Sequence, residues 1–245
     1  MSKVILITGA STGLGAATAR LLAPQNKIIV HYYSSKEAAE KVAKDIEESG
    51  GEAFLIQEDL TSEEACIRLV REVANRYAKL DILINNAGAL IRRQAAQELE
   101  WKLMLETFSL NTFSAMKISS LCIPLLEKGE DPNIINISSV AMRHGTPGVT
   151  IYVACKGAID SFTRGLANEL APKIRVNAVA PGVIDTPFHK RGSTPDPEKM
   201  KKFKEAIPLK RIGEAIHIAK TIKFLIENDF ITGETIDVNG GRFMR

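Results

Sequence analysis

The sequence predicts an α/β fold in which a parallel sheet of seven strands is covered by helices on both faces. Two observations carry this prediction. Short apolar runs rich in β-branched residues alternate along the 245-residue chain with segments of helical periodicity, and a glycine-rich turn joins the first run to the first helical segment. Because parallel strands buried on both sides read as continuous apolar runs, the alternation is typical of a doubly wound sheet.

The expected strands are short and have no polar face. The segments between them are long enough to hold the crossover helices that parallel strands need. In chain order, the strands are expected at residues 4–7, 28–30, 53–56, 82–84, 134–137, 175–179 and 235–238.

The intervening segments carry apolar residues at helical spacing. They predict helices over residues 16–23, 37–48, 62–78, 99–126, 152–170 and 215–226. A proline-rich polar stretch at residues 187–208 breaks the pattern, and we expect it to be a mobile substrate loop with a short helix inside. No linker interrupts the chain, so residues 1–245 are expected to form a single domain.

Composition excludes several classes of protein. A net charge of +3 is too small for a nucleic-acid surface, and three cysteines without Cys-x-x-Cys spacing and four scattered histidines indicate no metal site. The N-terminal apolar run is too short for a signal peptide, and no stretch approaches the roughly 20 apolar residues that span a bilayer. We expect a soluble cytoplasmic protein without membrane, nucleic-acid or metal partners.

The glycine-rich turn, Thr8 to Gly15, follows the first strand and leads into the first helix. Glycines there let the backbone approach a pyrophosphate, and the helix N-terminus directs N–H groups at its charge. This indicates a Rossmann-type dinucleotide site, although the Gly-x-x-x-Gly-x-Gly spacing leaves a tight turn without ligand as an alternative. The expected contacts are Gly9, Ser11, Thr12, Gly13, Leu14 and Gly15.

The end of the second strand bears on the choice of cofactor. An acidic residue there would bind the ribose 2′-hydroxyl of NAD and repel the 2′-phosphate of NADP. The segment instead contains Tyr33, Ser34 and Ser35, with no carboxylate. NADP(H) is therefore favoured over NAD(H), while an alternative role for Ser34 is to cap the next helix together with Glu37.

A tyrosine and a lysine, Tyr152 and Lys156, are spaced by one helical turn, and Ser139 precedes the tyrosine at the end of a strand. A phenol, an ammonium and a hydroxyl around one carbonyl could move a proton while a cofactor moves a hydride. The nearby ammonium would lower the pKa of the phenol. The alternatives are a core aromatic residue and a surface lysine, and Ser138 competes with Ser139.

These motifs, with Asp59, Asn85 to Gly88, Asn111, Pro181-Gly182, Thr186 and the segment from Ile231 to Gly241, resemble the short-chain dehydrogenase/reductase family over essentially the whole chain. The resemblance implies that Asn111 fixes a water linking Lys156 to solvent, that Lys156 holds the nicotinamide ribose, and that the protein is a homotetramer or homodimer through its two long helices. It also implies cofactor contacts from Asp59, Leu60, Asn85, Asn86, Ala87, Gly88, Tyr152, Lys156, Pro181, Gly182, Ile184 and Thr186.

The substrate is less well defined. Cationic side chains from three segments, among them Arg92, Arg143, His144 and His189, could converge on a carboxylate or phosphate. We expect NADPH-dependent reduction of a small polar keto compound, such as a sugar or sugar acid, by an enzyme that interconverts a secondary alcohol and a carbonyl. The alternatives are a 3-oxoacyl-carrier-protein reductase and, in another class, a non-catalytic dinucleotide-binding regulator.

Overall fold

A seven-stranded parallel sheet runs through the computed structural model, which describes residues 2–187 and 197–244. The seven expected strands are all present, and the predicted fold class is confirmed. The sheet has the order β3-β2-β1-β4-β5-β6-β9. The strands are β1 Val4–Ile7, β2 Lys27–Tyr32, β3 Glu52–Gln57, β4 Ile82–Asn85, β5 Asn133–Ile137, β6 Arg175–Pro181 and β9 Thr235–Val238.

The strand order reverses beside β1. The chain runs outward from β1 to β2 and β3, then crosses back to β4, so that Ile7 pairs with Val30 on one side and Ile84 on the other. In doubly wound sheets ligands bind at this reversal, beyond the carboxyl ends of the strands. The glycine-rich turn after β1 and the polar loop after β4 therefore lie side by side beyond the carboxyl ends of these two central strands.

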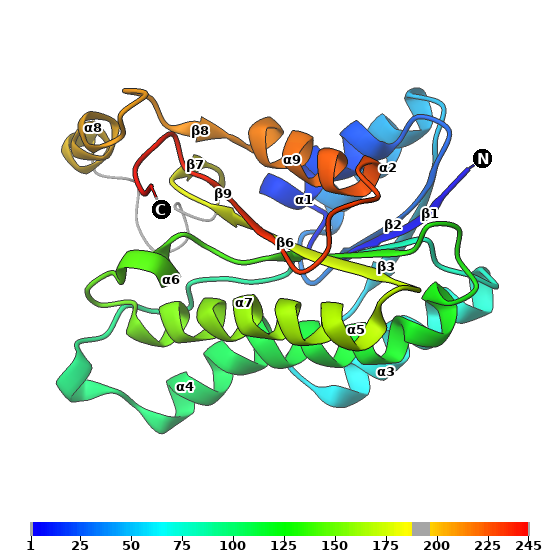
Figure 1. Ribbon diagram of the computed structural model, residues 1–245, viewed down its shortest axis with the longest axis horizontal. Coiled ribbons are helices and arrows are strands. Elements are labelled where there is room, and N and C mark those ends of the chain that lie inside the picture. The colour runs from blue at the N-terminus through cyan, green and yellow to red at the C-terminus, as the bar shows by residue number, and fades with distance from the viewer. Residues whose placement is uncertain (1, 188–196, 245) are drawn as a thin grey trace.

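Helices cover both faces of the sheet, as Figure 1 shows. On one face lie α1 (Gly13–Leu22), α2 (Lys36–Glu48) and α9 (Ala215–Glu227). On the other lie α3 (Glu63–Arg76), α4 (Trp101–Phe108), α5 (Ser114–Leu126) and α7 (Thr150–Leu170).

The strands lack a polar face because each face of the sheet has its own apolar core. Ile5 and Ile7 of β1 pack into the core beneath α1, α2 and α9, whereas Val4 and Leu6 pack into the core beneath α3, α5 and α7. All four side chains are buried, so alternate residues of one strand contribute to opposite cores.

One expected helix differs from the prediction. The segment 99–126 is not continuous: α4 ends at Phe108, a π-helical turn spans Ser109–Phe113, and α5 begins at Ser114. Shorter elements that the sequence did not indicate are a 3₁₀ turn at Ala96–Glu98, helix α6 (Ala141–His144) and a pair of two-residue strands, β7 (Ile184–Asp185) and β8 (Gly213–Glu214).

Helix α8 (Pro197–Ala206) is the short helix expected within residues 187–208, of which 188–196 lie outside the described part. Within the ranges that the structure describes, no helix combines the length and the apolar character needed to cross a bilayer.

Candidate active site

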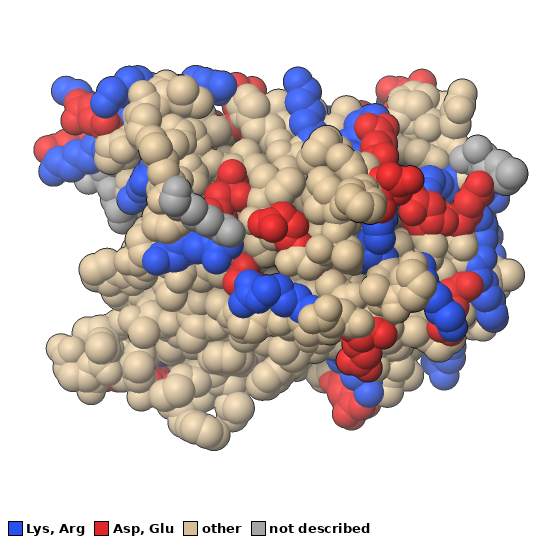
Figure 2. Space-filling view, viewed as in Figure 1, with Lys and Arg blue, Asp and Glu red and all other residues tan. Residues whose placement is uncertain are grey.

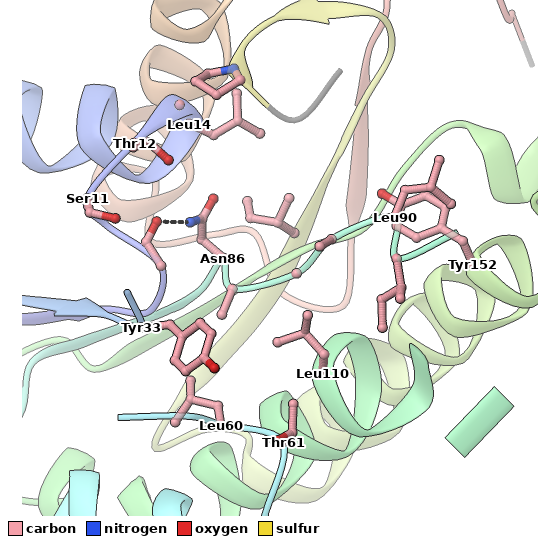
Figure 3. A pocket seen from close by; sticks show the side chains of 18 of the residues that line it. Ser11, Thr12, Leu14, Tyr33, Leu60, Thr61, Asn86, Leu90, Leu110 and Tyr152 are labelled. Carbon is pink, nitrogen blue, oxygen red and sulfur yellow. Dashed lines mark hydrogen bonds between the residues drawn. The ribbon is translucent and has the colours of Figure 1, made fainter. Parts of the chain in front are cut away.

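A cavity of about 850 Å³ lies beyond the carboxyl ends of the strands, at the reversal of strand order. Figure 3 shows Tyr33, Leu60, Thr61 and Leu110 together in one part of it, and Leu90 and Tyr152 in another. Most of the residues predicted to form the site line this cavity: Gly9, Ser11, Thr12, Gly13, Leu14, Tyr33, Ser34, Ser35, Asp59, Leu60, Asn86, Ala87, Gly88, Ser139, Tyr152, Lys156, Pro181, Ile184 and Thr186.

The glycine-rich turn has the geometry of a phosphate cradle. Gly9 and Gly13 adopt φ values of +65° and +56°, which side chains rarely tolerate. A Cβ atom on Gly15 would lie 2.5 Å from the Gly9 carbonyl oxygen, so Gly15 packs the helix against the turn and does not line the cavity. No side chain caps the N-terminus of α1, which leaves this end suited to an anion. These residues fit the pyrophosphate of a dinucleotide.

Hydrogen bonds of Asn86 connect this turn to the loop after β4. Its Nδ2 donates to the carbonyl oxygens of Thr8 at 2.8 Å and Gly9 at 2.9 Å, while the Thr8 hydroxyl accepts from the Asn86 and Ala87 N–H groups at 3.0 Å. Asn85 is buried away from the cavity, where its Nδ2 donates to Ser119 Oγ at 2.8 Å. Asn85 therefore does not line the cavity, where the resemblance implied a cofactor contact, whereas Asn86 does.

The far end of the cavity is formed by the loops after β2 and β3. Ser35, not Ser34, is the N-cap residue of α2, and its side chain makes no capping bond, so the alternative in which Ser34 caps this helix is wrong. Asp59 accepts from the N–H group of Thr61 at 3.1 Å and from its hydroxyl at 2.9 Å. Three further residues that no sequence motif singled out also line this end: His31, Glu58 and Thr61.

Tyr152 and Lys156 lie one turn apart on α7 and face the end of β5. Lys156 Nζ donates to the Ile137 carbonyl oxygen at 2.9 Å and lies 5.7 Å from the centroid of the Tyr152 ring. Ser139 lies in the turn after β5, where its hydroxyl is hydrogen-bonded with Tyr152. Ser138 donates to the Lys156 carbonyl oxygen at 2.9 Å, and so supports α7. The structure thus brings Ser139, Tyr152 and Lys156 together.

Burial determines the charge states of these groups. It raises the pKa of the Tyr152 phenol above its usual value, and the hydrogen bond with Ser139 opposes only part of this shift. The expectation that Lys156 lowers the pKa of Tyr152 is not met, because burial outweighs it and the ammonium lies over the ring. Burial also lowers the pKa of Lys156 to about 8. The phenol is therefore held in its protonated form.

Asn111 lies behind the cavity wall, in the π-helical turn. Its Nδ2 donates to the carbonyl oxygens of Ala89 at 3.0 Å and Thr107 at 2.9 Å, and its Oδ1 accepts from the Ala89 N–H group at 3.1 Å. A Cβ atom on Gly88 would lie 2.7 Å from Asn111 Oδ1 and 3.4 Å from Lys156 Nζ. Asn111 and Lys156 therefore both approach Gly88, and π-helical turns often occur at functional sites.

Three of the four expected substrate residues do not line the main cavity. Arg143 pairs through Nη2 with Asp160 at 3.4 Å and through Nε with Asp237 at 3.5 Å, because these largely buried carboxylates need a partner. The His144 ring lies 6.5 Å from the Phe243 ring, tilted by 41°. Arg92 pairs with Glu100, and both line a separate surface groove. His189 lies outside the described residues. Gly182, an expected cofactor contact, instead packs against Asn239.

Several lining residues escaped the sequence analysis. The only signal for them in the sequence is position, since they follow Gly88 or lie near Asn111. They are Ala89, Leu90, Ile91, Leu105, Glu106, Ser109 and Leu110. Among the residues that the structure describes, no group of histidines, cysteines and carboxylates is arranged to hold a metal ion.

A dinucleotide cradle that shares one cavity with a protonated phenol, a hydroxyl and a lysine defines an NAD(P)-dependent oxidoreductase. A family model described as enoyl-(acyl carrier protein) reductase matches residues 9–242. The chain belongs to the short-chain dehydrogenase/reductase family, and it is an NAD(P)-dependent dehydrogenase/reductase of that family. This assignment argues against the alternative of a non-catalytic dinucleotide-binding regulator.

Similar proteins support this assignment. A 3-oxoacyl-[acyl-carrier-protein] reductase from Staphylococcus epidermidis is 36% identical over 252 residues, which cover 100% of both chains. A short-chain dehydrogenase from Burkholderia cenocepacia in complex with NADP has a TM-score of 0.89 at 31% identity, covering 98% of this chain and 97% of the other. The angucycline C-6 ketoreductase LanV with bound NADP has a TM-score of 0.89 at 30% identity, covering 98% and 95%.

Proposed function

We propose that this enzyme reduces a small polar keto compound, such as a sugar or sugar acid, to a secondary alcohol with NADPH. The observation that carries the proposal is that Ser139, Tyr152 and Lys156 share one cavity with the glycine-rich turn, since carbonyl reduction consumes a proton that the phenol can supply. Hydride transfer is the chemistry that a nicotinamide dinucleotide supplies when bound.

Each polar group of the site has a distinct task. Tyr152 donates its proton to the carbonyl oxygen, and Ser139 donates a hydrogen bond to the same oxygen. Lys156 places a positive charge 5.7 Å from the centroid of the Tyr152 ring. This charge favours the phenolate left after proton transfer, although burial outweighs it and keeps the resting phenol protonated. Asn111 holds the loop after Gly88 through its hydrogen bonds with Ala89. Its further task, as the family resemblance implies, is to fix a water that links Lys156 to solvent.

The preference for NADP(H) rests on the end of β2. Tyr33, Ser34 and Ser35 line the cavity there, and none of them carries the negative charge that would repel a 2′-phosphate. The B. cenocepacia dehydrogenase and LanV, both similar over almost their whole length, have NADP bound. These observations support NADP(H) over NAD(H).

A carboxylate at this position should reverse the preference. In Ser34→Asp we expect the Kd for NADPH to rise at least about tenfold while the Kd for NADH changes little, because only NADPH carries the additional phosphate. Ser34→Asn is the matched control, since it has nearly the same shape without the charge. Fluorescence titration with both coenzymes makes the comparison. An equal rise in the Kd for NADPH in both variants would contradict the proposed phosphate contact.

A second candidate is the reduction of a 3-oxoacyl thioester. Apolar side chains, among them Leu90 and Ile91, line the cavity, and such a wall suits an acyl chain. The similarity to the S. epidermidis 3-oxoacyl-[acyl-carrier-protein] reductase favours this candidate as well. None of Arg92, Arg143 and His144 lines the main cavity, so these cationic side chains do not support the polar candidate as expected.

A substrate panel separates the two candidates. Uronates, keto acids, neutral ketones and an acetoacetyl thioester are offered with NADPH and NADH side by side, and coenzyme oxidation is followed. We expect the highest kcat/KM with NADPH and a polar keto compound. Fastest turnover of the thioester would favour the second candidate, and no oxidation of either coenzyme with any carbonyl would contradict both.

A further inference from the structure

The side chain of His31 joins the carboxyl ends of three neighbouring strands. It is the penultimate residue of β2, between β1 and β3 in the sheet, and it lines the cavity although only 2% of its surface is exposed. Its Nδ1 lies 2.9 Å from the N–H group of Gly9, and its Nε2 lies 3.1 Å from the carbonyl oxygen of Glu58. One ring therefore bridges the phosphate turn and the loop after β3.

These two partners determine where the ring carries its proton. The Gly9 N–H group is a donor, so Nδ1 must accept and carries no proton. The Glu58 carbonyl oxygen is an acceptor, so Nε2 must donate and carries the proton. Only the neutral ring protonated at Nε2 satisfies both contacts.

The charged groups around the ring do not change this protonation state. On the β3 side, Glu58 and Asp59 favour a charged imidazole, but both Glu58 carboxylate oxygens accept from Arg68 of α3 at 2.8 Å, and Asp59 accepts from Thr61. On the β1 side the ring meets the uncharged Gly9 turn. Burial is the largest influence and lowers the pKa of His31 to about 4.

The turn itself needs this support. The backbone carbonyl of His31 accepts from the Ala10 N–H group at 2.8 Å, so the ring and the backbone of one residue hold two successive residues of the turn. Gly9 has φ +65°, and it has little room to shift because an added Cβ would already lie 3.0 Å from Ala87 Cα. Without an acceptor at Nδ1, the Gly9 N–H group would be left unpaired in a partly buried position. This would destabilise the observed conformation of the turn.

We propose that His31 is a positioning residue of the dinucleotide site: as a neutral imidazole protonated at Nε2, it fixes the Gly9 turn and the Glu58 loop at the separation that the cofactor needs. The inference rests on the proposed dinucleotide-dependent function and assigns His31 to cofactor affinity, not to the chemical step. The sequence alone could not indicate it, because Gly9, His31 and Glu58 come from three different strand ends.

A set of variants tests the two contacts separately. His31→Asn keeps an acceptor where Nδ1 lies, His31→Gln keeps a polar group nearer to Nε2, and His31→Leu removes both contacts. We expect Kd values for NADPH within about threefold of the wild type for Asn, and at least about tenfold weaker for Gln and Leu, because the Gly9 contact is the critical one. At saturating cofactor, kcat should change little. Equal Kd values across the set, or a loss confined to kcat, would overturn the proposal.

The ring nitrogens of the unaltered protein give a second readout that needs no variant to fold. In ¹⁵N NMR spectra we expect His31 to remain neutral and protonated at Nε2 from about pH 8 to about pH 5.5, above its lowered pKa. A proton on Nδ1, or titration of the ring near its ordinary value, would overturn the proposed contacts. A wild type that binds neither coenzyme would instead contradict the proposed function, while the nitrogen shifts still decide the hydrogen bonding.

Discussion

Lys156 and His31 are basic side chains that burial makes easier to deprotonate. The pKa of Lys156 falls to about 8 and that of His31 to about 4, so near neutral pH the lysine is mostly charged and the histidine is neutral. Tyr152 shifts in the opposite sense for the same physical reason, since burial disfavours the charged form of an acid as well. The site therefore combines a protonated acid with a nearby cation.

The lowered pKa of Lys156 predicts how reduction depends on pH. Lysine is charged below its pKa, so the charge beside Tyr152 is present below about pH 8 and is lost as the pH rises through that value. We expect kcat for carbonyl reduction to be level at lower pH and to decline above about pH 8. In Lys156→Arg the guanidinium stays charged, so any activity that remains should lose this decline. A wild-type profile that stays level to about pH 10 would contradict the prediction.

The elements that hold the site depend on close approach of backbone segments. The loop after β4 passes Asn111 in the π-helical turn so closely that only a glycine fits at position 88. The spacing of apolar residues predicts an ordinary α-helix there. No residue type in the sequence distinguishes the π-helical turn from the α-helix on either side of it. The strand ends, by contrast, were predictable within a few residues, since the apolar runs of the sheet pack into cores on both of its faces.

A side chain on Gly88 should disturb the site with little effect on the rest of the fold. In Gly88→Ala the new methyl group would crowd Asn111 Oδ1, at 2.7 Å, and Lys156 Nζ, at 3.4 Å. We expect kcat to fall by at least about tenfold, which corresponds to about 1.4 kcal/mol of transition-state stabilisation. Steady-state kinetics and a thermal melt measure the two effects.

Gly157→Ala is the matched control. Gly157 lies within α7, and nothing lies within 4 Å of a Cβ atom added there. Because alanine is the better helix former, this change should raise the stability of the isolated chain by about 0.5 to 1 kcal/mol and leave kcat unchanged. Full activity of Gly88→Ala would show that the loop can yield, and would contradict the close packing.

Over the whole molecule, the site is assembled from segments far apart in sequence, and here prediction from sequence reached its limit. The glycine turn, the Tyr152–Lys156 pair and Ser139 could be predicted because each is a local pattern at a strand end or on a helix. The pairing of Arg143 with Asp160 and Asp237 could not, because it depends on how α6 meets α7 and β9. The prediction that Arg143 contacts the substrate rested on its positive charge alone, and it was wrong.

We expect copies of this chain to associate through the surface around α4 and the π-helical turn. Trp101 is the first residue of α4 and Phe113 is the last residue of the π-helical turn, and their exposed fractions are 72% and 50%. Figure 2 shows few charged side chains over α4 and the adjoining part of α7. Exposed aromatic residues on a surface with few charges are typical of a protein interface.

We expect Phe113→Glu to dissociate a homotetramer or homodimer, because burying an unpaired carboxylate in an apolar interface is costly. Lys41→Glu, an exposed charge reversal on α2, should leave the assembly intact. Size-exclusion chromatography with light scattering measures both masses. A mass unchanged by Phe113→Glu would place the interface elsewhere.

The central claim is that Tyr152 donates the proton during NADPH-dependent carbonyl reduction, and Tyr152→Phe tests it most directly. The change removes one hydroxyl group, and Tyr77→Phe, outside the cavity, removes another as a control. Single-turnover reduction of the best carbonyl from the panel, at saturating NADPH, should slow by about 10²- to 10⁴-fold in Tyr152→Phe, with a nearly unchanged Kd for NADPH. A rate for Tyr152→Phe within about threefold of the wild type and of Tyr77→Phe would contradict the account.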